Sequence, residues 1–174
     1  MKKSLFLFLL ISLIGSIAAQ DEVKVPDVVK KAIQKFTPKY DLKNCSWSVT
    51  GNNDDYYLCE ILLVQEDSNS PTVSLYSNKN GRDLSGSYSL KADDFDKYFP
   101  AELLKKVRAD FASQDSSPEK ALVDLAAGGK IKSIYFTANF DESSFLEAGY
   151  TEKGKVISKI KKGGKGGGWA VGNN

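Results

Sequence analysis

Two stretches of this 174-residue chain resemble each other at a nearly constant distance. The segment PDVVKKAIQKF, which begins at Pro26, resembles PAELLKKVRADF, which begins at Pro100, and the two prolines are 74 residues apart. Tyr76 and Tyr150 are separated by the same 74 residues, and a glycine follows each tyrosine within a few residues. Unrelated segments would seldom share one spacing, so the repeat predicts two units of about 75 residues each.

Each unit is predicted to begin with an amphipathic helix. In the first unit, apolar residues recur at three- and four-residue steps up to Phe36, with lysine and glutamine on the opposite side. Pro26 suits the first helical turn, where its missing N–H costs nothing, and Pro38 ends the helix because it disfavours helical backbone at Thr37. The same apolar stripe in the second unit consists of Leu103, Leu104, Val107 and Phe111.

Short strands separated by turn residues are predicted after each helix. In the first unit they cover about 44–50, 55–64, 72–77 and 83–90, and in the second about 130–139, 144–151 and 155–161. Because strand follows strand without an intervening helix, the sheets should be antiparallel. We therefore expect an α+β fold of two tandem units, each with a helical layer packed on its own antiparallel sheet.

Residues 118–127 allow two interpretations. The local sequence has Ser117-Pro118-Glu119-Lys120 before ALVDLAA and Gly128-Gly129 after it, which is typical of a capped helix with a glycine stop. The repeat spacing instead aligns this segment with the strand near 45–50 and makes the glycine pair a hairpin turn. We favour the helix.

The two ends of the chain differ in composition from the rest. Residues 1–19 have two lysines, an apolar run and then small residues, which is the pattern of a signal peptide cleaved near residues 18–20. The apolar run is shorter than the roughly 20 residues of a membrane span. We expect an exported protein, periplasmic or secreted, with units at 20–92 and 93–161 and a flexible Gly/Lys tail at 162–174.

The two cysteines, Cys45 and Cys59, flank one predicted hairpin. If Gly51-Asn52-Asn53 is a three-residue loop, Cys45 lies opposite Cys59 and Trp47 lies opposite Tyr57, close enough for a disulfide after a small adjustment. An exported protein is in an oxidising compartment, so we predict a disulfide. Two buried free thiols are the alternative.

Charge and histidine content limit the chemistry. Removing Lys2 and Lys3 from 24 basic residues leaves 22, against 22 acidic ones, so no electrostatic footprint for nucleic acid is expected. The chain has no histidine, which excludes Ser-His-Asp and Cys-His catalysis. The acidic clusters near Asp54-Asp55, Asp93-Asp94-Asp96 and Asp141-Glu142 lie at turns and lack the calcium-loop pattern. We expect no enzyme activity, no metal and no cofactor.

A candidate binding surface lies on the first hairpin. If Cys45, Trp47 and Tyr57 face the helix, the opposite face is open to solvent, because side chains alternate along a strand. Tyrosine among small polar residues is common in protein-contact surfaces. The candidate contact residues on this face are Ser46, Ser48, Tyr56, Leu58 and Glu60. In the tail, Trp169 among lysines and glycines is a further candidate.

Taken in order, a signal peptide, VPDVVKKAIQKFTP, a Trp47-bearing strand, a Tyr-Tyr strand with Glu60 and a turn ending at Gly81 resemble PepSY-like proteins. More specifically, they resemble the exported β-lactamase-inhibitor-like (BLIP-like) group. The resemblance covers residues 25–90 and, less closely, 100–160. It implies one or two modules, each a helix or helix pair on a sheet of about four antiparallel strands, with a non-catalytic role. The cysteine pair and the glycine-rich tail depart from the family.

Three functions are considered from these observations. The favoured one is an exported, monomeric module that binds a protein or peptide partner through an open sheet face, with inhibition as one outcome. A cystatin-like protease inhibitor would share the helix-on-sheet layout, but the chain lacks a Gln-x-Val-x-Gly loop. A hydrolase is disfavoured by the missing histidine.

Overall fold

The strands of the protein form one antiparallel sheet in chain order from β1 to β8. The computed structural model describes residues 23–51, 55–139, 141 and 144–164. The strands are β1 (Ser46–Thr50), β2 (Tyr56–Leu62), β3 (Thr72–Asn78), β4 (Ser85–Lys91), β5 (Lys120–Ala126), β6 (Lys130–Asn139), β7 (Ser144–Tyr150) and β8 (Val156–Gly164). Each strand pairs with the next one along the chain, so β1 and β8 are the two edges of the sheet.

The predicted fold of two tandem helix-on-sheet units is wrong, because the structure has a single sheet. Strand β4 pairs with β5 from Gly86↔Leu125 to Lys91↔Lys120, whereas in two separate sheets each of these strands would be an edge. Strands make up 43% of the described residues and helices 24%, so the molecule is mostly β. Joining the strands satisfies backbone N–H and C=O groups that two exposed edges would leave unpaired.

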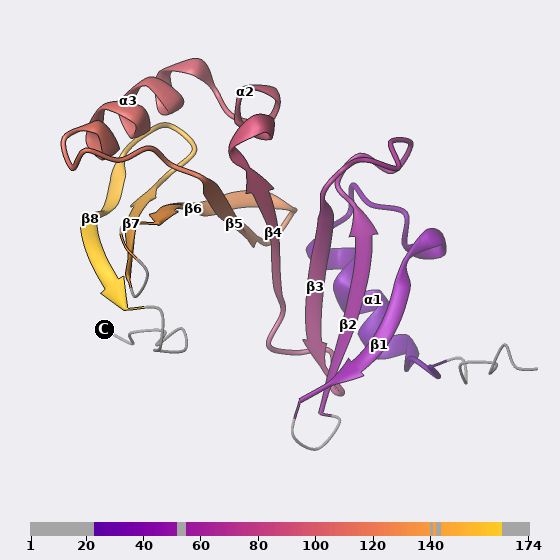
Figure 1. Cartoon of the computed structure of the whole chain (residues 1–174). Coiled ribbons are helices and arrows are strands. Elements are labelled where there is room, and N and C mark those ends of the chain that lie inside the picture. Colours follow the sequence, from indigo (N-terminus) through magenta and orange to yellow (C-terminus); the bar gives the residue numbers. More distant parts are fainter. Residues whose placement is uncertain (1–22, 52–54, 140, 142–143, 165–174) are drawn as a thin grey trace, which may run out of the picture.

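The helices lie on one face of this sheet (Figure 1). Helix α1 (Asp27–Phe36) packs behind β1–β3, whereas α3 (Ala101–Ala112) lies over the strands from β5 to β8. A short helix α2 (Phe95–Tyr98) and the 3-10 turns η1 (Leu42–Asn44) and η2 (Ala92–Asp94) complete the helical segments. Both predicted helices are confirmed, and α1 ends where Thr37 donates its backbone N–H to Ile33.

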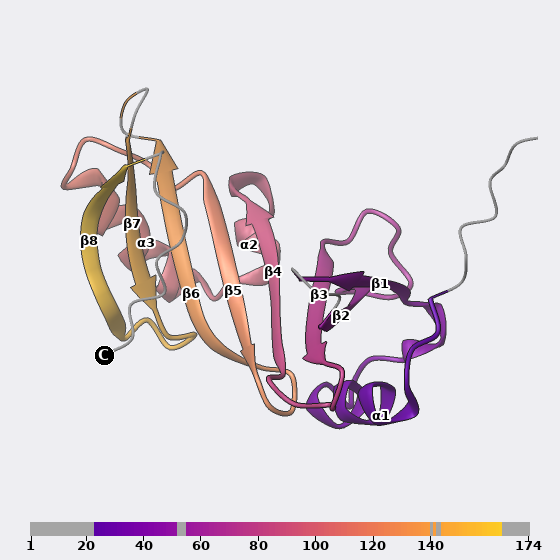
Figure 2. The same ribbon diagram turned by 90° about the horizontal axis from the view of Figure 1, so that it is seen from below.

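The sheet twists strongly along its length, as the view from below shows (Figure 2). Neighbouring strands rotate by about 20–25° on average, and over eight strands this rotation accumulates. The face covered by α1 at one end therefore points in a different direction from the face covered by α3 at the other. None of the helices within the described ranges is long and apolar enough to cross a membrane.

The helix favoured for residues 118–127 is wrong, because this segment is strand β5. Ala121, Val123 and Leu125 alternate with less buried neighbours and all point into the core. This two-residue period belongs to a strand, and pairing on both sides outweighs the local helix propensity. Gly128 and Gly129, with φ of +82° and +66°, form the turn that leads into β6.

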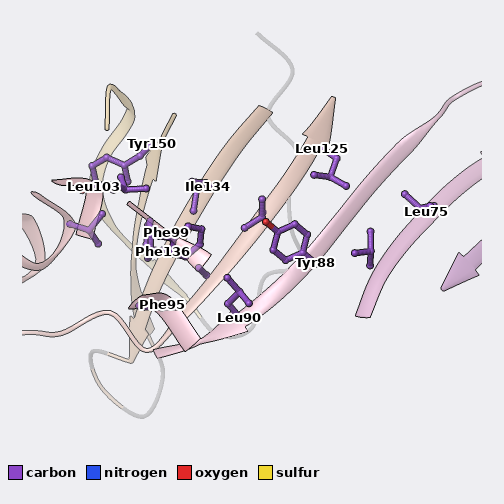
Figure 3. Close-up of a cluster of buried hydrophobic side chains, with 14 of the residues drawn as sticks. Leu75, Tyr88, Leu90, Phe95, Phe99, Leu103, Leu125, Ile134, Phe136 and Tyr150 are labelled. Atoms are coloured by element: carbon purple, nitrogen blue, oxygen red, sulfur yellow. The ribbon is translucent and has the colours of Figure 1, made fainter. Parts of the chain in front are cut away.

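An aromatic cluster forms the centre of the core beneath α2 and α3 (Figure 3). Phe136 of β6 contacts Phe95 edge-on, with ring centroids 5.3 Å apart, and also packs against Phe99 and Tyr150. Leu75 of β3 belongs to the same cluster of buried side chains, so the core is continuous across the β3–β4 boundary.

Two contacts join the halves of the chain. The backbone N–H groups of Gly128 and Gly129 donate to the carbonyl of Phe36 at 2.8 and 3.1 Å, so the β5–β6 turn caps the C-terminus of α1. At Gly86, a Cβ atom would lie 2.8 Å from Leu75, 3.3 Å from Phe36 and 3.4 Å from Leu125. Glycine at this position lets side chains from α1, β3 and β5 converge over β4.

Candidate functional site

The candidate surface is the face of β1–β3 that points away from α1. Alternation along β1 and β2 puts the five candidate residues of this hairpin on that one face, as predicted. The register pairs Ser46 with Glu60 and Ser48 with Leu58, and Tyr56 lies opposite Thr50. Tyr56, Leu58 and Glu60 are each half-buried, so their outer parts remain accessible.

The same surface continues onto β3. Two residues of this strand, Ser74 and Tyr76, belong to the surface but were not among the predicted contact residues. Ser74 lies opposite Glu60, and Tyr76 lies opposite Leu58. The signal for both was the alternation of the predicted strand at 72–77, which puts them on the polar side. With them, the surface has two tyrosines and one leucine beside a carboxylate and several serines.

A row of serine and acidic side chains extends from this surface across the sheet. It follows the cross-strand pairs and contains Ser46, Glu60, Ser74, Ser87, Asp124 and Ser133. Ser133 donates to a carboxylate oxygen of Asp124 at 3.0 Å, so this end of the row is held in place. The row carries two carboxylates and no basic residue, which makes it acidic.

Beyond β5 the same face is more closely filled. A Cβ on Gly149 would lie 2.9 Å from the Tyr135 ring, and one on Gly163 would lie 2.6 Å from the Phe145 ring. The two aromatic side chains therefore cover glycines on the neighbouring strands. Glu147 is 8% exposed and pairs with Lys161 at 3.5 Å. The face is thus more accessible from β1 to β4, where its outward side chains are exposed or half-buried.

The predicted register of the first hairpin is wrong by two residues. Cys59 lies opposite Trp47, and Tyr57 lies opposite Val49, so five residues separate the strands instead of three. The strand begins only at Ser46 because η1, capped by Asp41, precedes it. A shift of two residues leaves every side chain on its predicted face, since the alternation has a period of two.

Cys45 and Cys59 are free thiols in this structure and approach each other to 3.1 Å. Cys45 also donates to the carbonyl oxygen of Leu42 at 3.0 Å. Burial raises the pKa of both thiols, with the greater effect at the fully buried Cys59. Raised pKa values disfavour the thiolate, which is the reactive form, so a nucleophilic role is not supported. The disulfide stays a prediction.

The remaining predictions concern the two ends of the chain and the acidic clusters. Trp169 and residues 1–22 are outside the described residues, whereas β8 extends into the predicted tail as far as Gly164. The described acidic-cluster members include three that form ion pairs: Asp55 with Lys79, Asp96 with Arg108 and Asp141 with Lys162. Each lies on the surface, where a single pair contributes little stability.

Comparison with known proteins identifies the fold. No protein-family model and no curated protein matches the chain. Among solved structures, the chain is similar to a DUF2874 family protein from Bacteroides ovatus, with a TM-score of 0.54 and 16% sequence identity. The match covers 86% of this chain and 94% of that protein. The likeness shows a shared fold, and the resemblance to PepSY-like proteins stays a prediction.

Proposed function

We propose that this protein is an exported, non-catalytic module that binds a protein or peptide partner through the open face of β1–β3. The observation that supports the proposal is that the helices lie on one side of the sheet, while Tyr56, Leu58, Glu60 and Tyr76 lie together on the other. Tyrosines supply large contact area at low entropy cost, and the nearby serines supply hydrogen bonds.

The acidic row on this face suggests what the partner presents. Glu60 and Asp124 lie in one cross-strand row with serines between them, so arginine, lysine or hydroxyl donors would complement it. A partner enzyme whose active-site cleft was covered by this face would be inhibited. The chain's lack of histidine favours binding over catalysis.

A capture experiment with the mature protein, from residue 20 onward, tests the proposal. Immobilised protein is exposed to envelope extract, and bound proteins are identified by mass spectrometry. We expect the double variant Tyr56→Ala/Glu60→Ala to lose the partner, while Lys105→Ala/Lys153→Ala, on exposed sites of the second half, retains it. Retention of every partner by the double variant would show that the chosen face is wrong.

A further inference from the structure

The two edges of the sheet differ in how they are protected. Strand β8 carries Lys159, Lys161 and Lys162, and its pairing with β7 is interrupted by register shifts. Charged side chains and bulges are the usual means of preventing an edge from pairing with another chain. Strand β1 (SWSVT) has no charged residue, no proline and an uninterrupted register with β2. Its β-branched and aromatic residues favour strand pairing.

A basic hollow of about 560 Å³ lies on the helix side of β1. Its lining comes from α1, the 41–45 segment and β1, and consists of Lys30, Lys31, Gln34, Asp41, Leu42, Lys43, Cys45 and Trp47. The positive charge of Lys30 lowers the pKa of the Cys45 thiol, though less than burial raises it. Lys30 is an exposed residue that lines the hollow, within electrostatic reach of Cys45.

The lysines outnumber the acids that line the hollow. Asp41 is the one carboxylate in the lining, and its oxygen accepts the backbone N–H of Lys43 at 3.0 Å. Within the described part of the chain, Lys30, Lys31 and Lys43 form no ion pair. Half-buried Trp47 supplies an apolar wall, so the hollow combines positive charge with an aromatic surface.

We propose that β1 accepts an extended acidic segment of a partner protein as a ninth strand. Main-chain hydrogen bonds to the edge would supply affinity, and alternate side chains would supply specificity. In such a strand every second side chain points to the helix side, over Trp47 and into the hollow, where carboxylates would meet the lysines. The remaining side chains would lie beside Ser46 and Ser48. This site therefore meets the open face along Ser46 and Ser48, but its basic hollow lies on the other side of the sheet and is opposite in charge to the acidic row.

Charge complementarity favours an acidic strand from a partner protein, rather than a second copy of this chain, as the segment that pairs with β1. If two β1 strands paired with each other, the hollow of each copy would face a strand without a carboxylate. The lysines would then remain uncompensated, whereas an acidic strand neutralises them. A free small anion could also enter the hollow, but it would leave the edge of β1 unpaired.

The probe for the test is an end-blocked peptide of about seven alternating threonine and glutamate residues, long enough to span a typical strand. Binding is measured with Trp169→Phe protein, which leaves Trp47 as its one tryptophan, by fluorescence and by calorimetry. We expect saturable binding that weakens with added salt. The same peptide methylated at alternate backbone nitrogens should bind at least about tenfold more weakly, because it cannot donate to the edge.

Charge reversal then tests the hollow. Lys30→Glu/Lys43→Glu should weaken peptide binding at least about tenfold, a change of about 1.4 kcal/mol. Lys105→Glu/Lys153→Glu, a matched reversal at exposed sites, should leave it unchanged. Tyr56→Ala/Glu60→Ala should also leave it unchanged, which separates this site from the proposed open-face function.

Three results would overturn the proposal. Equal binding of the methylated peptide would exclude strand addition, and this control does not depend on the folding of any variant. Full competition by succinate at concentrations similar to those of the peptide would mean that the hollow binds a small anion only. Formation of a dimer that the peptide cannot dissociate would assign the edge to a second copy of the chain.

Discussion

Some buried side chains of this protein have a polar atom without a hydrogen-bond partner among the described residues. Tyr40 is 4% exposed, and its hydroxyl oxygen has no hydrogen-bond partner among the described residues. Burial raises its pKa to about 12. An unpaired buried hydroxyl costs free energy, because its hydrogen bonds with water are lost without replacement.

We expect Tyr40→Phe to stabilise the protein at neutral pH by about 1 kcal/mol, because the ring stays and the unpaired hydroxyl is removed. The pKa of Tyr40 is higher in the folded state, about 12 against about 10, so its neutral form favours folding below pH 10. That contribution is lost as the pH rises towards 12. Wild type should therefore lose more stability than Tyr40→Phe between pH 10 and pH 12.

Urea unfolding at neutral pH and across this alkaline window measures both effects. Tyr56→Phe, at the open face, is the matched control and should leave the stability at neutral pH nearly unchanged. Destabilisation of Tyr40→Phe at neutral pH would mean that the hydroxyl forms a hydrogen bond.

The cysteine pair allows a second prediction at the residue scale. Oxidation to a Cys45–Cys59 disulfide should raise the free energy of unfolding by on the order of 3 kcal/mol, because it closes a loop of about 15 residues. Protein oxidised in this way should weigh two hydrogens less than its sequence mass, and reduction should lower its melting temperature. Cys45→Ser/Cys59→Ser is the control that should not respond to reduction. Two thiols that titrate in the unfolded, unreduced protein would exclude the bond.

At the scale of elements, the fold depends on how α1, β3, β4 and β5 meet over Gly86. We expect Gly86→Val to destabilise the protein by about 1–3 kcal/mol, because the added methyls would collide with Leu75 and Phe36. The second substitution Leu75→Ala should partly restore stability in the Gly86→Val background, although it destabilises the wild type. Thermal and urea unfolding of the four proteins measure this coupling.

The control for this cycle is Ser89→Val, an exposed position on the same strand β4, which should change stability little. If the stability changes of Gly86→Val and Leu75→Ala were additive in the double variant, the side chain added at position 86 would not compete with Leu75 for space. That result would contradict the structure at this joint.

At the scale of the molecule, the single sheet predicts that the halves fold together. A fragment ending at residue 92 would expose the β4 edge and leave the Phe36 carbonyl without the Gly128 and Gly129 donors. We therefore expect residues 20–92 and 93–164, expressed separately, to lack a cooperative thermal transition, and to recover one when mixed. Circular dichroism and size-exclusion chromatography measure both states. A cooperative transition in either fragment alone would show independent units.

Local patterns in the sequence were sufficient for much of the fold. Turn residues between short runs predicted seven strands close to their observed positions. Alternation then assigned Tyr56, Leu58 and Glu60 to the open face, because a strand's two faces are set by a period of two. That assignment survived a register error for the same reason. The apolar stripe ending at Phe36 likewise predicted α1, since a helix buries one side of a 3.6-residue period.

What only the tertiary structure decided depends on contacts between distant segments. Residues 120–126 form a strand because β4 and β6 pair with both of its edges, and no local propensity reports such pairing. The two repeats share one sheet because Gly86 lets three side chains converge and the β5–β6 turn caps α1. The basic hollow was missed because Lys30, Lys43 and Trp47 belong to separate elements that become neighbours only when α1 packs beside β1.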